Sequence, residues 1–542
     1  MRTFILSVIF SLTYVISATA QESDSVAAPG DWYLLDPEQD HFQGISVEKA
    51  YSTLLHDQPS KTVLVAIVDS GIDIDHEDLK SVIWTNVGEI PGNGIDDDHN
   101  GYIDDVHGWD FIGGKDGDVN EDTYELTREF IRLKKKFETT DETRIRKKQR
   151  AEYEQYKKIK EKFERLKTKN TQQFEFYDKL YSNVTHSIDT LKVLLKTNKI
   201  TQENLDQFNS NDPALLYAKV YLLDIFKNIG DQISLEDFVA QLKEGLDYFS
   251  VIVKYGYNED FDSRKIIGDD YADVYQKNYG NNDVKGPDAT HGTHVAGIIG
   301  ADRKNNLGIK GIADNVKIMS VRAIPNGDER DKDVANAILY AVNNGAKIIN
   351  MSFGKPFSPQ KEAVDKAVKY AVQKGVLLVH AAGNDGKDND TEKNFPSRYY
   401  LGGKEAKNWL EVGASGWENN KNLVAEFSNY GKKTVDFFSP GVQIYSTTPG
   451  NTYKNESGTS MASPVTAGVA ALLMSYFPEL TALEVKDILS KSTRKFDHLT
   501  VDKPGSKSQI DFGELSITGG LVNAYEAVKL AQSLRNQRVG KK

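Results

Sequence analysis

The pattern of hydrophobic positions predicts an α/β fold that a helical stretch interrupts. The unbroken apolar run 62–68 is typical of a parallel strand that is buried on both faces. Beyond residue 287, further strands are predicted at 316–321, 347–351 and 376–379. Helices are predicted between and after these strands at 290–299, 333–343, 361–373 and 461–477. Because strands and helices alternate, we expect a three-layer α/β/α fold with a mostly parallel central sheet.

Residues 118–265 follow a different pattern. Apolar residues recur there at helical spacing among dense lysine, arginine and glutamate residues. They form two groups, one of Phe130, Leu133 and Phe137, the other of Tyr156, Ile159, Phe163 and Leu166. This predicts an all-helical insertion. The locally basic stretch 128–169 fits solvated helix faces better than an anion-binding surface.

Composition and the first residues narrow the function classes. A net charge of −12 over 542 residues argues against nucleic acid as the main partner. No cysteine is present, which excludes disulfides, thiolate catalysis and cysteine-bound metal. The start resembles a secretory signal over 1–20, with Arg2, an apolar run over 4–16 and the small residues Ala18-Thr19-Ala20. We therefore expect an exported protein without a membrane anchor, periplasmic or extracellular.

Four loops at strand ends or helix starts carry side chains with complementary chemistry. Asp69 ends the first strand, His291 opens a helix, Asn384 follows the strand over 376–379, and Ser460 lies at the start of the last helix. Each alone is more often a turn, cap or structural residue. Together they supply a nucleophile, a base, a group that orients the base and an oxyanion donor. The combination predicts acyl transfer.

Three blocks resemble the signature segments of the subtilisin-like serine proteases, or subtilases. They are Asp69-Ser70-Gly71, His291–Gly297 and Gly458–Pro464, in the family's order. Ala381–Asn384 resembles the family's oxyanion segment, and Gly519–Ala524 resembles the end of its catalytic domain. The resemblance covers 31–117 and 266–535 but not the helical insertion, 118–265. It implies a secreted serine endopeptidase with an Asp-His-Ser triad and an acyl-enzyme intermediate.

The resemblance also implies where a substrate binds. Ser352, Phe353 and Gly354 resemble one wall of the pocket for the residue before the scissile bond, and Ala381, Ala382 and Gly383 resemble the other. Exposed main-chain edges there would hold an extended peptide by strand addition. Asn394 falls where the family often has glycine, so we expect a shallower pocket.

Calcium is expected at two places. The spacing of Asp96, Asp98 and Asn100 matches the first half of a calcium loop, although a merely solvated acidic turn is the alternative. The family resemblance implies a second, structural site. Its ligands would be Gln39, Asp78, Asn305 and the carbonyls of Leu307 and Ile309.

Two hypotheses remain open beside the endopeptidase. A catalytically silent subtilase fold could present the helical insertion to a partner, and an exopeptidase is also compatible with these residues. We expect the insertion to act as a lid that favours flexible peptides, because its ends emerge near the catalytic loops. About 40 residues between the signal and the first strand leave little room for an ordinary pro-segment. The physiological substrate and the oligomeric state stay unassigned.

Overall fold

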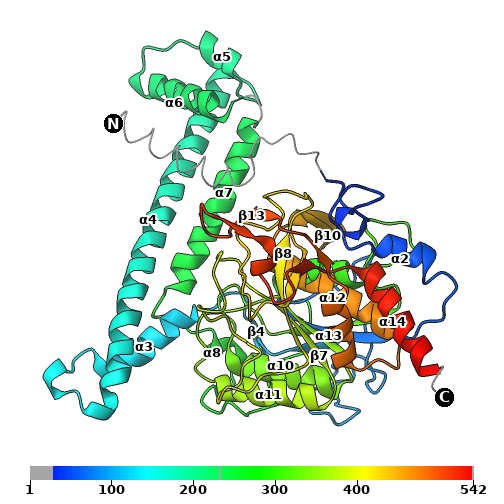
Figure 1. Cartoon of the computed structure of the whole chain (residues 1–542). Helices are drawn as coiled ribbons and strands as arrows, with labels where there is room; N and C mark the ends of the chain where they lie inside the picture. Colours follow the sequence, from blue (N-terminus) through cyan, green and yellow to red (C-terminus); the bar gives the residue numbers. More distant parts are fainter. Residues whose placement is uncertain (1–27, 231–232, 540–542) are drawn as a thin grey trace. The chain divides into compact units, whose positions relative to one another are not determined.

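The computed structural model describes residues 28–230 and 233–539. The predicted signal, 1–20, lies outside these residues. The chain forms two compact units, which are coloured along the sequence in Figure 1. Among the described residues, the helical unit comprises Phe130–Glu259, and the α/β unit comprises Ala28–Glu129 with 260–539. The helical unit is thus shorter at both ends than the insertion expected at 118–265.

The α/β unit is built on a mostly parallel sheet. In the described part its order is β12-β15-β9-β8-β7-β6-β1-β5-β2, and only β12 pairs antiparallel to its neighbour. Its strands are β1 (Val63–Asp69), β2 (Gly108–Asp110), β5 (Val316–Arg322), β6 (Ile348–Met351), β7 (Leu377–Ala381), β8 (Trp409–Ser415), β9 (Phe437–Pro440), β12 (Arg494–Lys495) and β15 (Gly520–Leu521). Two-stranded ribbons are β3 (Gly113–Gly114) with β4 (Gly117–Asp118), β10 (Ile444–Thr448) with β11 (Thr452–Glu456), and β13 (Thr500–Asp502) with β14 (Gln509–Asp511).

Helices cover both faces of this sheet, as the alternation along β1 demonstrates. Val65 and Ile67 belong to a core cluster with α9 and α12, whereas Ala66 and Val68 belong to one with α10 and α11. The helices of this unit are α2 (Val47–Thr53), α8 (Arg264–Ile267), α9 (Thr290–Gly300), α10 (Asp331–Asn343), α11 (Lys361–Gln373), α12 (Thr459–Tyr476), α13 (Ala482–Lys491) and α14 (Ala524–Val539), with short turns η1 (Trp32–Leu34) and η5 (Phe512–Glu514). The fold is therefore the expected three-layer α/β/α arrangement.

The helical unit has its own core. Leu191, Leu222 and Leu242, on three different helices, are almost fully buried together, and Phe130 stacks on Phe163 with ring centroids 4.3 Å apart. Its elements are α3 (Glu125–Phe137), which begins in the α/β unit, η2 (Glu142–Arg144), η3 (Lys147–Gln149), α4 (Arg150–Leu195), α5 (Gln202–Gln207), α6 (Pro213–Ile229), α7 (Leu235–Val251) and η4 (Ile252–Gly256). The described residues include no helix long and apolar enough to cross a membrane.

The parallel strands bring functional loops to one edge of the sheet. Asp69 is the last residue of β1, Ser352 directly follows β6, and the segment leading to Asn384 follows β7. The helix predicted over 290–299 is α9, which begins at Thr290 with Ala289 at the cap position. Asp288 Oδ1 accepts the Thr290 N–H at 3.0 Å, because a carboxylate is favoured at a helix N-terminus.

Candidate functional site

Asp69 and His291 form a direct pair. His291 is the second residue of α9, and its Nδ1 lies 2.7 Å from Asp69 Oδ1. The same carboxylate oxygen accepts the Ser70 N–H at 2.8 Å, and Asp69 is only 2% exposed. A carboxylate held in this way fixes the ring orientation and the tautomer of the histidine, leaving Nε2 available for proton transfer.

This pair changes the basicity of the imidazole. Burial opposes the charged ring, but the nearby Asp69 carboxylate outweighs it and raises the pKa of His291 to about 9. The His291 side chain is 36% exposed, so solvent still reaches the ring. By contrast, burial lowers the pKa of His294 to about 4, and His294 Nε2 lies 3.1 Å from the Lys454 carbonyl oxygen. His291 alone of these two is placed as a base.

Ser460 is the second residue of α12, which contacts α9. Its Oγ donates a hydrogen bond to the Ser352 carbonyl oxygen at 3.0 Å. In the described residues no hydrogen bond joins this hydroxyl to the His291 ring. Such bonds are often formed only in the substrate complex, and rotation about a single side-chain torsion would redirect the hydroxyl.

Two donors converge beside Ser460. Asn384 Oδ1 accepts hydrogen bonds from Thr459 N and Thr459 Oγ1, both at 2.9 Å, which turns the Asn384 amide nitrogen the other way. A Cβ placed on Gly458 would lie 3.4 Å from Asn384 Nδ2 and 3.5 Å from the Ser460 N–H nitrogen. The space that glycine leaves free is therefore flanked by both donors, as an oxyanion site requires.

A buried polar network supports the Ser460 segment. Ser352 Oγ donates to the Ser460 carbonyl at 2.9 Å and accepts from Asn350 Nδ2 at 2.9 Å. Asn350 Oδ1 in turn accepts from Ser463 Oγ at 2.8 Å. Neither Asn350 nor Ser463 is among the site residues predicted from the sequence. Ser463 lies in the same motif as Ser460, so the sequence could have indicated it. Asn350 lies in an apolar strand, where nothing in the sequence marks it as part of the site.

Asn394 lies between the two walls of the expected pocket. Its amide nitrogen donates to the carbonyl oxygens of Ala381 and Ala382 at 3.2 and 3.1 Å. On the other side, a Cβ on Gly354 would meet Asn394 Oδ1 at 2.4 Å. The asparagine therefore fills space between the segments 352–354 and 381–383.

Asp78 and the loop after α9 form a buried polar site. Asp78 Oδ1 accepts from Asn305 Nδ2 at 2.7 Å, and Asp78 Oδ2 accepts from the Ile309 N–H at 3.2 Å. Leu307 donates its N–H to Asn305 Oδ1 at 2.9 Å. Burial raises the pKa of the Asp78 carboxyl, which has no ion-pair partner among the described residues. Gln39 is exposed, and its N–H donates to Asp36 Oδ1 at 3.2 Å; its role as a calcium ligand stays a prediction.

The acidic loop is folded around its own carboxylates. Carboxylate oxygens of Asp96, Asp98 and Glu89 lie within 4.8 Å of one another. The Asn100 N–H donates to both aspartates at 3.0 Å, while its side-chain amide donates to Asp98 and Asp105. A calcium loop usually ends with a glutamate ligand. Glu89 instead comes before the loop in the sequence, so the motif did not indicate it.

The chain is similar in sequence to a known protein family and to several serine proteinases. The model of the Subtilase family matches residues 60–513. The thermophilic serine proteinase of Bacillus sp. (strain AK1) is 40% identical over 54% of this chain and 61% of its own length. Subtilisin DY of Bacillus licheniformis is 39% identical over 37% of this chain and 69% of its own, and thermitase of Thermoactinomyces vulgaris is 42% identical over 34% and 61%. The chain belongs to the subtilase family.

Proposed function

We propose that this chain is a serine endopeptidase that hydrolyses peptide bonds through an acyl-enzyme intermediate. Ser460 is the nucleophile, His291 the general base and then the general acid, and Asp69 the group that orients and stabilises the imidazolium. The observation that carries this proposal is the 2.7 Å contact between His291 Nδ1 and Asp69 Oδ1. The chain is a subtilase, and its Ser460 lies in the first turn of α12, which contacts the helix of His291.

The reaction proceeds in two steps. His291 Nε2 takes the Ser460 proton as Oγ attacks the substrate carbonyl, and the Asn384 amide with the Ser460 N–H stabilises the oxyanion. The imidazolium then protonates the leaving amine. Water, deprotonated by His291, releases the acyl group by the reverse sequence of proton transfers.

The direct test is hydrolysis of a peptide by the wild-type protein and by Ser460→Ala. Loss of essentially all activity in the variant, with unchanged thermal unfolding, supports the assignment. Activity that survives the substitution refutes it. Equal inactivity of both proteins would favour the silent scaffold instead.

Substrate binding is proposed along the segments 352–354 and 381–383, with Asn394 behind them. Asn394 fills space that a glycine would leave open, so we expect small or medium side chains before the scissile bond to be preferred over large aromatic ones. Asn394→Gly should raise kcat/KM for peptides with a large aromatic residue at this position more than for peptides with alanine.

Calcium is proposed as a structural ion. At one site Asp78 would hold it together with the side-chain oxygen of Asn305 and the carbonyls of Leu307 and Ile309. A buried carboxylate without an ion-pair partner fits a hard cation, which would relieve the cost of burying the charge. The loop with Asp96, Asp98, Asn100 and Glu89 offers a second set of oxygen ligands. A bound ion would tie together segments that are distant in sequence, and no catalytic role is assigned to it.

The protein is proposed to act outside the cytoplasm, in the periplasm or beyond the cell. The signal-like start supports this proposal. Its partners would be peptides or proteins. Fractionation of cells that express the full chain, followed by N-terminal sequencing near Gln21, tests both the export and the cleavage position.

A further inference from the structure

One wall of the proposed cleft, the segment 352–354, has a free main-chain edge that ends at Lys355. Ser352, at the start of this edge, accepts the Ser460 hydroxyl. Phe353 and Gly354 follow without main-chain hydrogen bonds in the described part of the chain, so they are open to strand addition. Lys355 then pairs with Phe395 in both directions, at 3.0 and 2.9 Å, which closes the edge.

The segment 326–329, at the start of α10, is already covered by residues 120–128 of the same unit. Main-chain hydrogen bonds join Asn326 to Asn120 and Asp122 at 2.8 and 3.0 Å. Gly327 has φ +139, and a Cβ there would meet the Asp122 carbonyl oxygen at 2.3 Å. Arg128 donates to the carbonyl oxygens of Asp328 and Glu329, both at 3.1 Å. A peptide therefore cannot pair with this segment while residues 120–128 remain in place.

Lys355 and Glu125 form an ion pair that joins the open edge, 352–355, to the covering segment, 120–128. Lys355 Nζ lies 2.7 Å from Glu125 Oε2, 2.9 Å from Asp331 Oδ1 and 2.8 Å from the Glu329 carbonyl oxygen. Although burial favours a neutral acid, Arg128 and Lys355 lower the pKa of Glu125 to about 2, so the bridge stays charged at every physiological pH.

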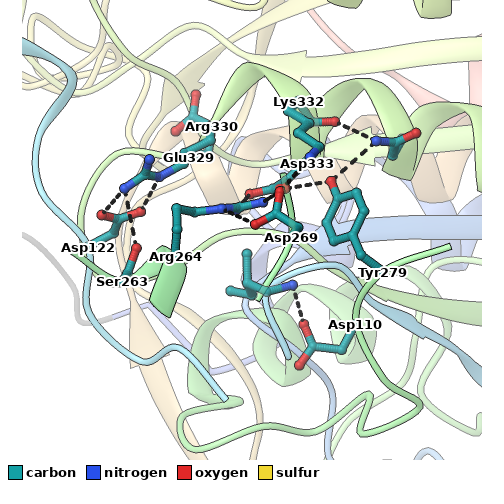
Figure 2. Close-up of polar contacts among 12 residues, drawn as sticks. Asp110, Asp122, Ser263, Arg264, Asp269, Tyr279, Glu329, Arg330, Lys332 and Asp333 are labelled. Carbon is teal, nitrogen blue, oxygen red and sulfur yellow. Dashed lines mark hydrogen bonds and ion pairs between the residues drawn. The ribbon is translucent and has the colours of Figure 1, made fainter. Parts of the chain in front are cut away.

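A second set of ion pairs includes one, Arg330–Asp122, that holds the covering segment 120–128. Figure 2 shows Arg330 bonded to Asp122 and Ser263, and Arg264 bonded to Asp269 and Asp333. These side chains are almost fully buried. Removing one member of such a network leaves an uncompensated charge and is strongly destabilising, so the cover is a fixed part of the α/β unit.

From these contacts we infer that Glu125, Arg128 and Lys355 close the cleft about three residues upstream of the scissile bond. The open edge from Ser352 to Lys355 spans three residue steps, roughly 10 Å of extended chain. The inference rests on the proposed peptide hydrolysis at Ser460 and narrows its substrates. Within the proposed endopeptidase activity, the enzyme favours bonds with about three residues upstream of them and disfavours longer upstream chains.

The test compares two fluorogenic peptides with the same residues around the cleaved bond. Both have a free amino terminus, but one has three residues upstream of the cleaved bond and the other has six. We expect kcat/KM for the short peptide to exceed that for the long one by roughly tenfold or more. Equal values, or a preference for the long peptide, would overturn the inference. No cleavage of either, together with no fluorophosphonate labelling, would instead refute the proposed peptidase.

Arg128→Ala removes the guanidinium that covers the carbonyl groups of Asp328 and Glu329. It should therefore bring the ratio of kcat/KM for the short peptide to kcat/KM for the long peptide towards one. A ratio measured on one preparation does not depend on how much of the enzyme is folded. Arg264→Ala is the matched control, because it removes another buried arginine of the cluster that makes no bond to the carbonyls of 328 or 329. A ratio that Arg128→Ala leaves unchanged, or that both variants change equally, would contradict the assigned role.

Discussion

At the scale of single residues, the proposed site depends on groups that orient Ser460 and His291 as much as on these two residues. Asn384 is held by Thr459 through its oxygen, which leaves the amide nitrogen for the oxyanion. The sequence motifs predicted Asp69, His291, Asn384 and Ser460, because each follows a strand or opens a helix. They could not predict that Thr459 holds the Asn384 oxygen, since this contact joins positions 75 residues apart.

Replacing Asn384 by alanine tests the oxyanion donor. We expect kcat to fall by roughly 10²–10³, the loss typical of removing one such donor, with KM little changed. Steady-state kinetics on a short peptide measures both constants. Asn389→Ala is a suitable control, because this nearby amide donates to the Ala382 carbonyl and not to the proposed oxyanion site. An equal loss in both variants would contradict the specific role of Asn384.

The pH dependence of activity tests the Asp69–His291 pair. His291 has its pKa raised to about 9, and a base must be neutral, so kcat/KM should rise with pH through about 9. Asp69→Asn should move this midpoint to lower pH, while kcat falls by about 10⁴. A pH–rate profile of both proteins supplies the midpoints.

The same pair has an opposite effect on stability. A raised folded-state pKa means that the charged pair stabilises the fold fully below the unfolded pKa of about 6.5. This contribution is lost as pH rises through about 9, so stability falls where activity rises. Urea unfolding at several pH values should show the decrease in wild type and a smaller one in Asp69→Asn; identical pH dependence would contradict the coupling.

At the scale of elements, the spacing of apolar residues was sufficient to predict helices in which that spacing is regular. The helix predicted over 361–373 matches α11, and the long helical pattern corresponds to α4, which contains neither glycine nor proline over Arg150–Leu195. By contrast, the hydrophobic pattern did not predict strand β8. This strand is buried along its length yet carries Glu411, whose charge is accommodated by His380 and the Trp409 indole N–H. Those partners are set by tertiary packing, which hydrophobic periodicity does not report.

The calcium loops are tested through thermal unfolding. At free calcium of 100 times Kd, one site adds about 2.7 kcal/mol to the free energy of unfolding, so chelation should lower Tm clearly. Asp78→Asn should remove part of the difference between calcium and chelator, and Asp98→Asn a further part. Asp57→Asn, an exposed carboxylate outside both loops, should leave the difference unchanged. A Tm that does not respond to chelation would contradict both sites.

At the scale of the whole molecule, two units carry separate cores. Both clusters that flank the parallel sheet lack residues of Phe130–Glu259, and the helical unit packs around its own leucines and aromatic residues. The helical insertion is predicted over 118–265, and the compact helical unit comprises Phe130–Glu259. The flanking residues instead make buried ion pairs within the α/β unit, such as Arg330 with Asp122 and Arg264 with Asp333. A run of charged residues in sequence does not reveal such pairs.

Replacing 130–259 by a short Gly/Ser linker tests this division. Because the α/β core does not use these residues, we expect the deletion variant to fold and to cleave a short peptide with kcat/KM near that of the full chain. The expected lid role predicts that it also cleaves a folded protein faster than the full chain does. Failure to fold would contradict the independence of the two cores, and unchanged cleavage of the folded protein would contradict the lid.

The central claim is that Ser460 is activated for nucleophilic attack, and labelling with a fluorophosphonate tests it most directly. This reagent phosphonylates a serine that a neighbouring base activates, so it needs no knowledge of the natural substrate. We predict stoichiometric modification, located by mass spectrometry on Ser460, that is lost in Ser460→Ala and strongly slowed in His291→Ala. Absence of labelling in the folded wild-type protein, or labelling that persists in Ser460→Ala, would contradict the account.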